Sequence, residues 1–172
     1  SVTMGNDINP NNSVNIKNLK MVTEKEINYL KIGLFDKKYL SEHQVILEKI
    51  NFKKTQPICV MFADQDFDLN NVEKLIDIGY QGIMIDTCYK NSKSIVDLLS
   101  REEIKDFLKI VKARNMICGL SGSLKLKHIA MLKELNPDFL GFRGQLCDPS
   151  KARHKFNINL AQEVSKKIKL SF

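Results

Sequence analysis

The sequence predicts an α/β fold built around a parallel β-sheet, and three observations support this. Short apolar segments of strand length alternate with segments whose apolar residues recur at helical spacing. The alternation repeats about every 30 residues, and no hairpin signal joins any two strands. Strict alternation implies right-handed crossovers between parallel strands. Six strands would complete an open doubly wound sheet, whereas a (β/α)8 barrel would lack two of its units.

In the first half of the chain, three predicted strands alternate with three predicted helices. The first strand leads through a turn-rich loop into a lysine-rich helix. Ser41, with Gln44 three residues later, resembles a capping box and predicts the start of the second helix. Gly79 ends the third helix. The predicted strands are 2–4, 29–35 and 58–64, and the predicted helices are 13–26, 41–50 and 72–79.

The second half begins with an apolar run from Gly82 to Asp86. This run has no helical period, which is typical of a strand buried on both faces. Ser100 and Glu103 form another capping box, followed by a helix with apolar residues at helical spacing. The remaining predicted strands are 116–120 and 139–142, and helical segments are predicted near 95–99, 129–136 and 160–168.

The composition predicts a single domain over residues 1–172, because a hydrophobic content of 43% is enough for one core. No apolar run is long enough to span a bilayer and no secretory signal is present, so we expect a cytoplasmic protein without membrane contact. The net charge of +7 comes from scattered lysines without interleaved aromatic residues. This pattern favours a small phosphorylated substrate and argues against nucleic acid.

Four cysteines, Cys59, Cys88, Cys118 and Cys147, are 29, 30 and 29 residues apart. No pair has the close spacing of a zinc or redox site, so the sequence predicts no metal site. We also expect no cofactor. The even interval indicates a structural repeat that places each cysteine near the same level of a strand.

Lys31 lies in the middle of a predicted strand, between Leu30 and Ile32. A lysine that cannot easily reach water is held in its neutral form, which accepts a proton or attacks a carbonyl. We therefore expect Lys31 to be catalytic. The alternative is an edge strand from which Lys31 extends outward into solvent.

Two acidic residues, Asp64 and Asp86, stand where predicted strands end, and Lys90 follows four residues after Asp86. Parallel α/β folds place their chemistry at the carboxyl ends of strands. We therefore predict that Asp86 and Lys90 are catalytic and that Asp64 binds substrate. The alternative is that Asp86 only caps its loop and Lys90 is a solvated surface residue.

Two small-residue loops follow the next two strands. The segment Ser121, Gly122, Ser123 should open a helix, where backbone amides can approach an anion. The GFRG segment supplies Arg143 and Gly144, and the arginine can add a charged fork to the same anion. Barrels commonly build a phosphate site from their last two loops, so we predict that these five residues bind phosphate.

Taken together, YLKIGLF with Lys31, MFAD with Asp64, IMIDTCYK with Asp86 and Lys90, SGSLKLKHI and GFRGQLC resemble the (5-formylfuran-3-yl)methyl phosphate synthase family. These are lyases of methanofuran biosynthesis in methanogens, with relatives in methylotrophic bacteria. The likeness covers essentially the whole chain. It implies a (β/α)8 TIM-type barrel that joins two glyceraldehyde 3-phosphate molecules, eliminating phosphate and water. It also implies that Lys31 is the proton-transferring lysine and that Asp86 and Lys90 are active-site residues.

The resemblance further implies a Schiff-base lysine on a strand that would precede Ser1. By the family's order, the chain corresponds to strands three to eight of the barrel and lacks the first two βα units, so we expect it to be N-terminally truncated and poorly active alone. Two other interpretations stay open: an aldolase-like phosphate-binding barrel acting on another aldehyde, and a truncated non-catalytic homologue that pairs with another subunit. A homo-oligomer is compatible with the sequence.

Overall fold

The computed structural model describes residues 1–172 except 6, 26, 66, 90–92, 149–154 and 171–172. The strands are β1 (Val2–Thr3), β2 (Tyr29–Leu34), β3 (Gln56–Phe62), β4 (Gly82–Asp86), β5 (Ile117–Leu120) and β6 (Phe139–Leu140). The α-helices are α1 (Ser13–Thr23), α2 (Leu40–Lys49), α3 (Leu69–Asp77), α4 (Ile95–Leu98), α5 (Arg101–Ala113), α6 (Ile129–Glu134) and α7 (Ile158–Leu170). Three 3₁₀ turns are η1 (Lys37–Tyr39), η2 (Leu126–His128) and η3 (Gly144–Leu146).

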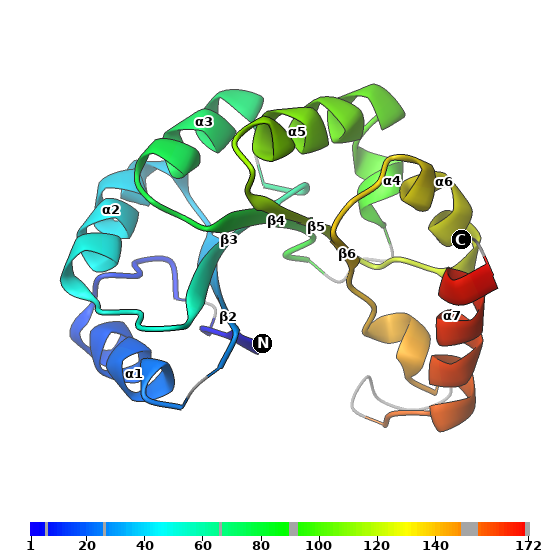
Figure 1. Ribbon diagram of the computed structural model, residues 1–172, viewed down its shortest axis with the longest axis horizontal. Helices are drawn as coiled ribbons and strands as arrows, with labels where there is room; N and C mark the ends of the chain where they lie inside the picture. Colours follow the sequence, from blue (N-terminus) through cyan, green and yellow to red (C-terminus); the bar gives the residue numbers. More distant parts are fainter. Residues whose placement is uncertain (6, 26, 66, 90–92, 149–154, 171–172) are drawn as a thin grey trace.

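The six strands form one sheet in the order β1-β2-β3-β4-β5-β6, and every neighbouring pair is parallel. Strict alternation of strand and helix therefore predicted the α/β class and the parallel pairing correctly. The sheet curves into a half-barrel with helices α2 to α6 outside it, and an opening separates α1 from α7 (Figure 1).

The predicted (β/α)8 TIM-type barrel is wrong for this chain, because the sheet does not close. In the described residues β1 pairs with β2 alone and β6 pairs with β5 alone. Both end strands are two residues long, so each offers few ladder hydrogen bonds to a further strand. An open doubly wound sheet is also wrong, since helices α2 to α6 share the convex side (Figure 1).

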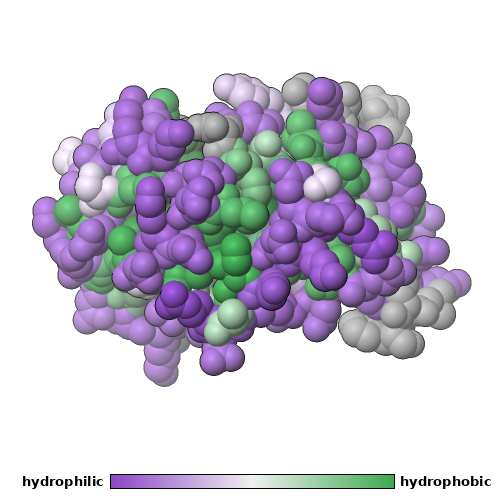
Figure 2. Space-filling view, turned by 90° about the horizontal axis from the view of Figure 1, so that it is seen from above, coloured by the Kyte–Doolittle hydropathy of each residue, from purple (hydrophilic) through white to green (hydrophobic). Residues whose placement is uncertain are grey.

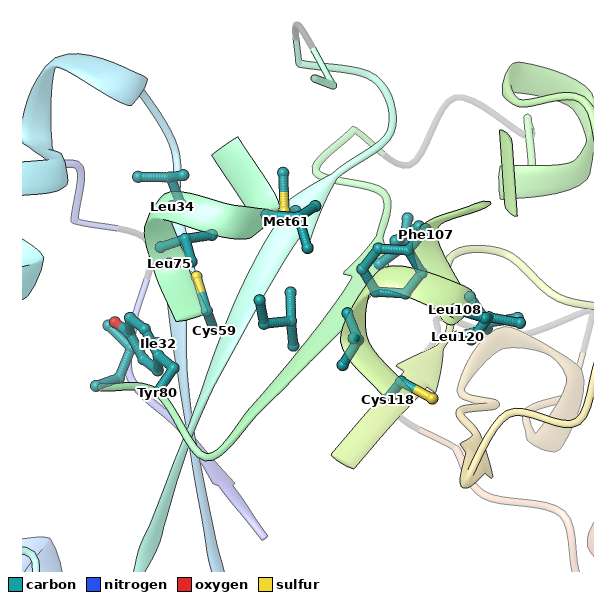
Figure 3. Packing of buried hydrophobic residues seen from close by; sticks show 14 of the residues in the cluster. Ile32, Leu34, Cys59, Met61, Leu75, Tyr80, Phe107, Leu108, Cys118 and Leu120 are labelled. Carbon is teal, nitrogen blue, oxygen red and sulfur yellow. The ribbon is translucent and has the colours of Figure 1, made fainter. Parts of the chain in front are cut away.

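The main core lies between the sheet and its helices. Alternate residues of each strand point into it, as the two-residue period of a strand requires. On the helix side, α5 presents Phe107, which is fully buried, and α3 presents Leu75. Figure 3 shows these residues packed with side chains from the strands. The strand residues in this layer include Leu30, Ile32, Cys59, Met61, Ile83, Ile85, Cys118 and Leu120.

The concave face of the sheet has a second, smaller cluster. Ile58, Val60 and Met84 are buried there, on the side of the sheet away from α3 and α5. Glycines on this face leave room for large neighbours. An ideal Cβ at Gly119 would lie 2.0 Å from Cζ of Phe139, so the Phe139 ring occupies the space of the missing side chain. Phe139 and Phe62 pack against this cluster and shield its apolar side chains from water.

Local sequence signals set most helix starts. The predicted capping box is confirmed at α5, where the Ser100 amide donates to the Glu103 carboxylate over 2.7 Å. The capping box predicted at Ser41 is wrong: α2 already begins at Leu40, and the Ser41 hydroxyl donates to Glu42. The turn η1 precedes this helix and takes Asp36 as its N-cap.

The prediction that the cysteines lie near the same level of the strands is confirmed for only two of them. Cys59 is registered with Ile83, which is registered with Cys118, so these two cysteines lie at one level of the sheet. Cys88 and Cys147 lie in loops after β4 and η3 instead.

The outer face over α3 and α5 is mostly hydrophilic, with apolar side chains visible between the helices (Figure 2). This is the expected surface of amphipathic helices. Among the helices in the described part of the chain, none combines the length and the apolar character needed to cross a membrane.

Candidate functional site

The carboxyl ends of β4, β5 and β6 bring several of the predicted site residues to one edge of the sheet. Asp86 is the last residue of β4, and Phe62, the last residue of β3, is its registered neighbour. Ser121 follows β5 and its amide donates to the Ile85 carbonyl over 2.7 Å. Gly141 follows β6 and its amide donates to Leu120 over 2.8 Å. Asp86, Ser121 and Gly141 therefore stand on adjacent strand ends, as the sequence predicted.

Lys31 points to the concave face. Its neighbours Leu30 and Ile32 pack in the helix-facing core, so alternation turns the lysine the other way. The side chain is half-buried, which means that it reaches water more easily than its apolar flanks suggested. Lys31 is registered with Ile58, which is registered with Gly82, four residues before Asp86. The ammonium group therefore has to extend along the concave face to approach the carboxyl edge.

Asp86 is half-buried and tied to the backbone around it. Its Oδ1 accepts a hydrogen bond from the Thr87 amide over 2.7 Å, and its carbonyl accepts one from the Ala63 amide over 2.9 Å. These bonds fix the end of β4 against the end of β3. Lys90, the predicted partner of Asp86, lies outside the described residues.

Asp64 has both carboxylate oxygens engaged by the loop after β4. Oδ1 accepts from the Cys88 amide over 2.8 Å, and Oδ2 accepts from the Tyr89 amide over 2.7 Å. Hydrogen bonds from amides to a charged oxygen are stronger than neutral ones. Asp64 therefore clamps residues 88–89, directly after the strand that carries Asp86. Its predicted contact with substrate stays a prediction.

We expect the substitution Asp64→Ala to free this loop while leaving the sheet intact. Amide hydrogen exchange at Cys88 and Tyr89 should accelerate by about tenfold or more, because each amide loses its acceptor. Exchange measured residue by residue by NMR checks this, with Asp106→Ala on the exposed side of α5 as the control. Unchanged protection of both amides would show that the clamp contributes nothing.

The Ser121–Gly122–Ser123 segment adopts an unusual backbone. Gly122 and Ser123 both have positive φ, at 99° and 51°. A Cβ at Gly122 would lie 2.6 Å from Cγ2 of Ile95 and 2.9 Å from the Thr87 amide nitrogen, so only glycine fits this close approach between two loops. The Ser123 hydroxyl oxygen is buried and has no hydrogen-bond partner among the described residues.

The two predicted phosphate loops adjoin each other. An ideal Cβ at Gly141 would lie 2.8 Å from Cβ of Ser121, which places the start of GFRG against the start of SGS. Arg143 and Gly144 are exposed, and Arg143 directly precedes η3. The expectation that SGS opens a helix is wrong, since two residues and the turn η2 separate it from α6. Any anion there would be bound by loop groups and Arg143 instead of a helix N-terminus.

Sequence reasoning missed a pocket between the loops that follow β2 and β3. This pocket, called here the β2–β3 pocket, has a volume of about 320 Å³. Its lining includes Leu34, Phe35, Met61, Phe62, Gln65 and Phe67. The available signal was the placement of Phe35 and Phe62 at the ends of two consecutive strands.

A buried histidine also escaped the sequence analysis. His43 on α2 is completely buried, and its Nδ1 lies 2.5 Å from the hydroxyl of Tyr80, itself buried. Burial lowers the pKa of His43 to about 4. Burial likewise raises the pKa of Tyr80 well above its usual value. The sequence feature that could have predicted this burial is the position of His43 three residues before Ile46, on the apolar side of the helix.

Comparison with known proteins gives the chain its relatives. The 4-HFC-P synthase family profile matches residues 1–165. The (5-formylfuran-3-yl)methyl phosphate synthase of Methanococcus maripaludis strain C7 is 30% identical over 131 residues, covering 69% of this chain and 55% of that protein. The synthase of the same name from Methanocaldococcus jannaschii is 29% identical over 153 residues, covering 82% and 63%. The chain spans about half the length of the curated relatives it matches.

A solved structure shares the fold. The crystal structure of the Amycolatopsis orientalis BexX/CysO complex superposes with a TM-score of 0.58 at 9% identity, covering 91% of this chain and 62% of that one. At this identity the likeness concerns the fold alone. The family match extends over nearly the whole sequence, from β1 into α7. The chain belongs to the 4-HFC-P synthase family, a family of enzymes.

Proposed function

We propose that this chain forms the substrate-binding end of a lyase that condenses two molecules of glyceraldehyde 3-phosphate to (5-formylfuran-3-yl)methyl phosphate, with loss of phosphate and water. Residues 1–172 would act as one domain. The names of the curated relatives support the product. The observation that carries the proposal is the gathering of Asp86, Ser121 and Gly141 at adjacent strand ends, with Lys31 on the concave face below them.

Lys31 and Asp86 are the proposed reacting groups. Condensing a triose phosphate requires a proton to move beside a carbonyl, and a lysine amine performs this step when it is placed within hydrogen-bond reach. Asp86 would hold a substrate hydroxyl, because its carboxylate sits at the strand edge with a backbone-fixed orientation. Lys90 would complete the set, as its position four residues after Asp86 predicts.

The phosphate group is proposed to bind at the adjoining loops. Ser123 contributes a hydroxyl without an existing partner among the described residues. Ser121 and Gly122 in the same loop and Gly144 in the adjoining one are the other small residues proposed to border the phosphate. Arg143 is exposed beside them and supplies the positive charge that a phosphate requires. Asp64 is the remaining proposed substrate-binding residue, and its carboxylate also holds the loop after β4 in place.

The test is direct turnover. The purified protein is mixed with glyceraldehyde 3-phosphate, and furan aldehyde absorbance and phosphate release are followed together. Both signals should rise with matching stoichiometry, although slowly, because the chain is expected to be poorly active alone. Phosphate release without furan absorbance would contradict the condensation. Turnover of other phosphorylated aldehydes, with none of glyceraldehyde 3-phosphate, would instead favour a different aldolase-type reaction.

A further inference from the structure

The β2–β3 pocket borders the proposed catalytic edge of the sheet and contains none of the residues assigned above. Phe62, the registered neighbour of Asp86, is part of its lining. Leu34 and its registered neighbour Met61 also line it, near the carboxyl ends of β2 and β3 (Figure 3). The volume of about 320 Å³ is at the lower end of the range for small-molecule ligands. The pocket therefore lies one strand away from the proposed reacting carboxylate.

The aromatic side chains of the pocket already have aromatic partners. The rings of Phe35 and Phe62 stack on each other with centroids 4.7 Å apart. Gly33 permits this stack, because a Cβ there would lie 2.7 Å from Phe35 and 3.2 Å from Phe62. Phe67 lies edge-on to the buried Phe107, with ring centroids 6.3 Å apart. These rings therefore bound the pocket, and the recognition of a ligand falls to its polar groups.

Gln65 supplies a hydrogen-bond acceptor at the inner side of the pocket. Its Oε1 is buried and has no hydrogen-bond partner among the described residues. A buried carbonyl oxygen without a donor is unfavourable, so a ligand hydroxyl that donates to it would be stabilised. The Gln65 amide donates to the Phe62 carbonyl over 3.1 Å, which keeps Gln65 close to the end of β3. Asn71 of α3, also buried, adds a second side-chain amide to the lining. These groups suit a ligand that carries hydroxyl groups.

The β2 side of the pocket offers an ammonium group. Asp36 and Lys37 both belong to the lining. The Asp36 carboxylate lies 3.1 Å from the ammonium of Lys38, which offsets its charge. Lys37 is exposed, and a lysine ammonium has three N–H donors, so it can bind a phosphate and keep another contact as well. A phosphate at this side would stay partly hydrated while the rest of the molecule lay inside the pocket.

The proposed reaction needs places for two triose phosphates. The phosphate of one is assigned to the loops after β5 and β6, and the β2–β3 pocket is three strand spacings away, about 14 Å. With covalent bonds of about 1.5 Å, two triose phosphates whose carbon ends face each other span about 12 Å between their phosphorus atoms. The two positions are therefore far enough apart for both phosphates, and close enough for the carbon ends to meet near Asp86.

We propose that the β2–β3 pocket binds the second of the two triose phosphate molecules, with its C2 hydroxyl donating to Oε1 of Gln65 and its phosphate at Lys37. The molecule would then run from the loop after β2 to the loop after β3, with its aldehyde carbon toward Asp86 at the end of β4. The identity of the ligand rests on the proposed function, whereas the pocket and its acceptor are independent of it.

The probe for this subsite is glycerol 3-phosphate. It keeps the phosphate and the C2 hydroxyl but has no carbonyl group, so it can neither condense nor react with lysines. Met61 lines the pocket, so the protein is labelled with ¹³C at its methionine methyl groups and titrated with the probe. The Met61 methyl resonance should shift in a saturable way, while that of Met131 on α6 stays in place. The Met61 shift should persist in Arg143→Gln, which weakens the other phosphate position.

Two variants test the proposed contacts, each with a matched control. Gln65→Leu removes the acceptor at similar volume and should weaken probe binding at Met61 roughly tenfold. Its control is Gln81→Leu, an exposed glutamine just before β4, which should leave binding unchanged. Lys37→Gln should weaken binding about threefold at low ionic strength, because an exposed charge pair contributes modestly. Its control is Lys109→Gln on the helix side of the sheet, which should have no effect.

The subsite is overturned if Met61 shows no saturable shift, if its shift is lost in Arg143→Gln, or if Gln65→Leu and Gln81→Leu weaken binding equally. If furan aldehyde forms from glyceraldehyde 3-phosphate and Met61 does not respond to the probe, the proposed function stands and the subsite alone is wrong. If Met61 responds as expected and no furan aldehyde forms, the pocket binds a triose phosphate, but its place in the condensation is wrong.

Discussion

Replacing Lys31 with methionine is expected to lower kcat for furan aldehyde formation by about a thousandfold, in the range found for loss of a general acid or base. Methionine keeps the length of the side chain but cannot carry a proton. Because Lys31 faces the concave side, registered beside the buried Ile58, an apolar replacement should leave the folded state as stable as before. Absorbance of the furan aldehyde measures kcat, and urea unfolding followed by circular dichroism measures stability.

The control for this prediction is Lys109→Met. Lys109 is exposed on α5, on the helix side of the sheet, so its loss removes one positive charge without touching the concave face. A similar decrease in both variants would assign the effect to net charge. Activity of Lys31→Met within a few times that of the control would remove Lys31 from the proposed mechanism.

The second prediction concerns the stability of the protein at acidic pH. The free energy of unfolding should fall by about 2 kcal/mol between pH 7.5 and pH 5, and by about 3 kcal/mol near pH 4, because of His43 alone. The pKa of His43 is lowered from 6.5 to about 4 in the folded state. Below pH 6.5 the unfolded chain therefore binds a proton that the folded chain does not, and stability is lost as pH falls toward the folded pKa.

The physical cause is the closed environment of the ring. His43 is fully buried, and its Nε2 has no hydrogen-bond partner among the described residues. Protonation would place a charged N–H there without an acceptor, which a buried site disfavours strongly. The neighbouring Tyr80 hydroxyl at Nδ1 is kept neutral by its own burial and gives no compensating charge.

The matched variant is His43→Asn, whose side-chain oxygen can replace Nδ1 as partner of the Tyr80 hydroxyl. It should be less stable than the natural protein at pH 7.5 and should show a flatter pH dependence between pH 7.5 and 5. Because the chain has no tryptophan, circular dichroism is the suitable probe of urea unfolding. His128 is also buried enough for its pKa to be lowered, so His128→Asn measures its separate contribution. Equal pH slopes in the natural protein and His43→Asn would contradict the prediction.

The candidate site was predicted in part. Positions that depend on a strand ending, such as Asp86 and Ser121, can be placed from sequence because the apolar run stops at a definite residue. The hydrogen-bond partners of a side chain beyond the strand end depend on another segment of the chain. Asp64 binds amides 24 and 25 residues later, and neither spacing nor composition indicates such a contact.

By itself, the sequence determined the order of strands and helices, the parallel pairing and the edge of the sheet where polar residues gather. These properties follow from periodicity within short windows, which each segment carries alone. Only the tertiary structure decided that the sheet stays open, that Phe35 and Phe62 enclose a pocket, and that His43 meets Tyr80. Curvature, register and burial arise from contacts between distant segments, and the energies of those contacts depend on geometry that a single segment does not contain.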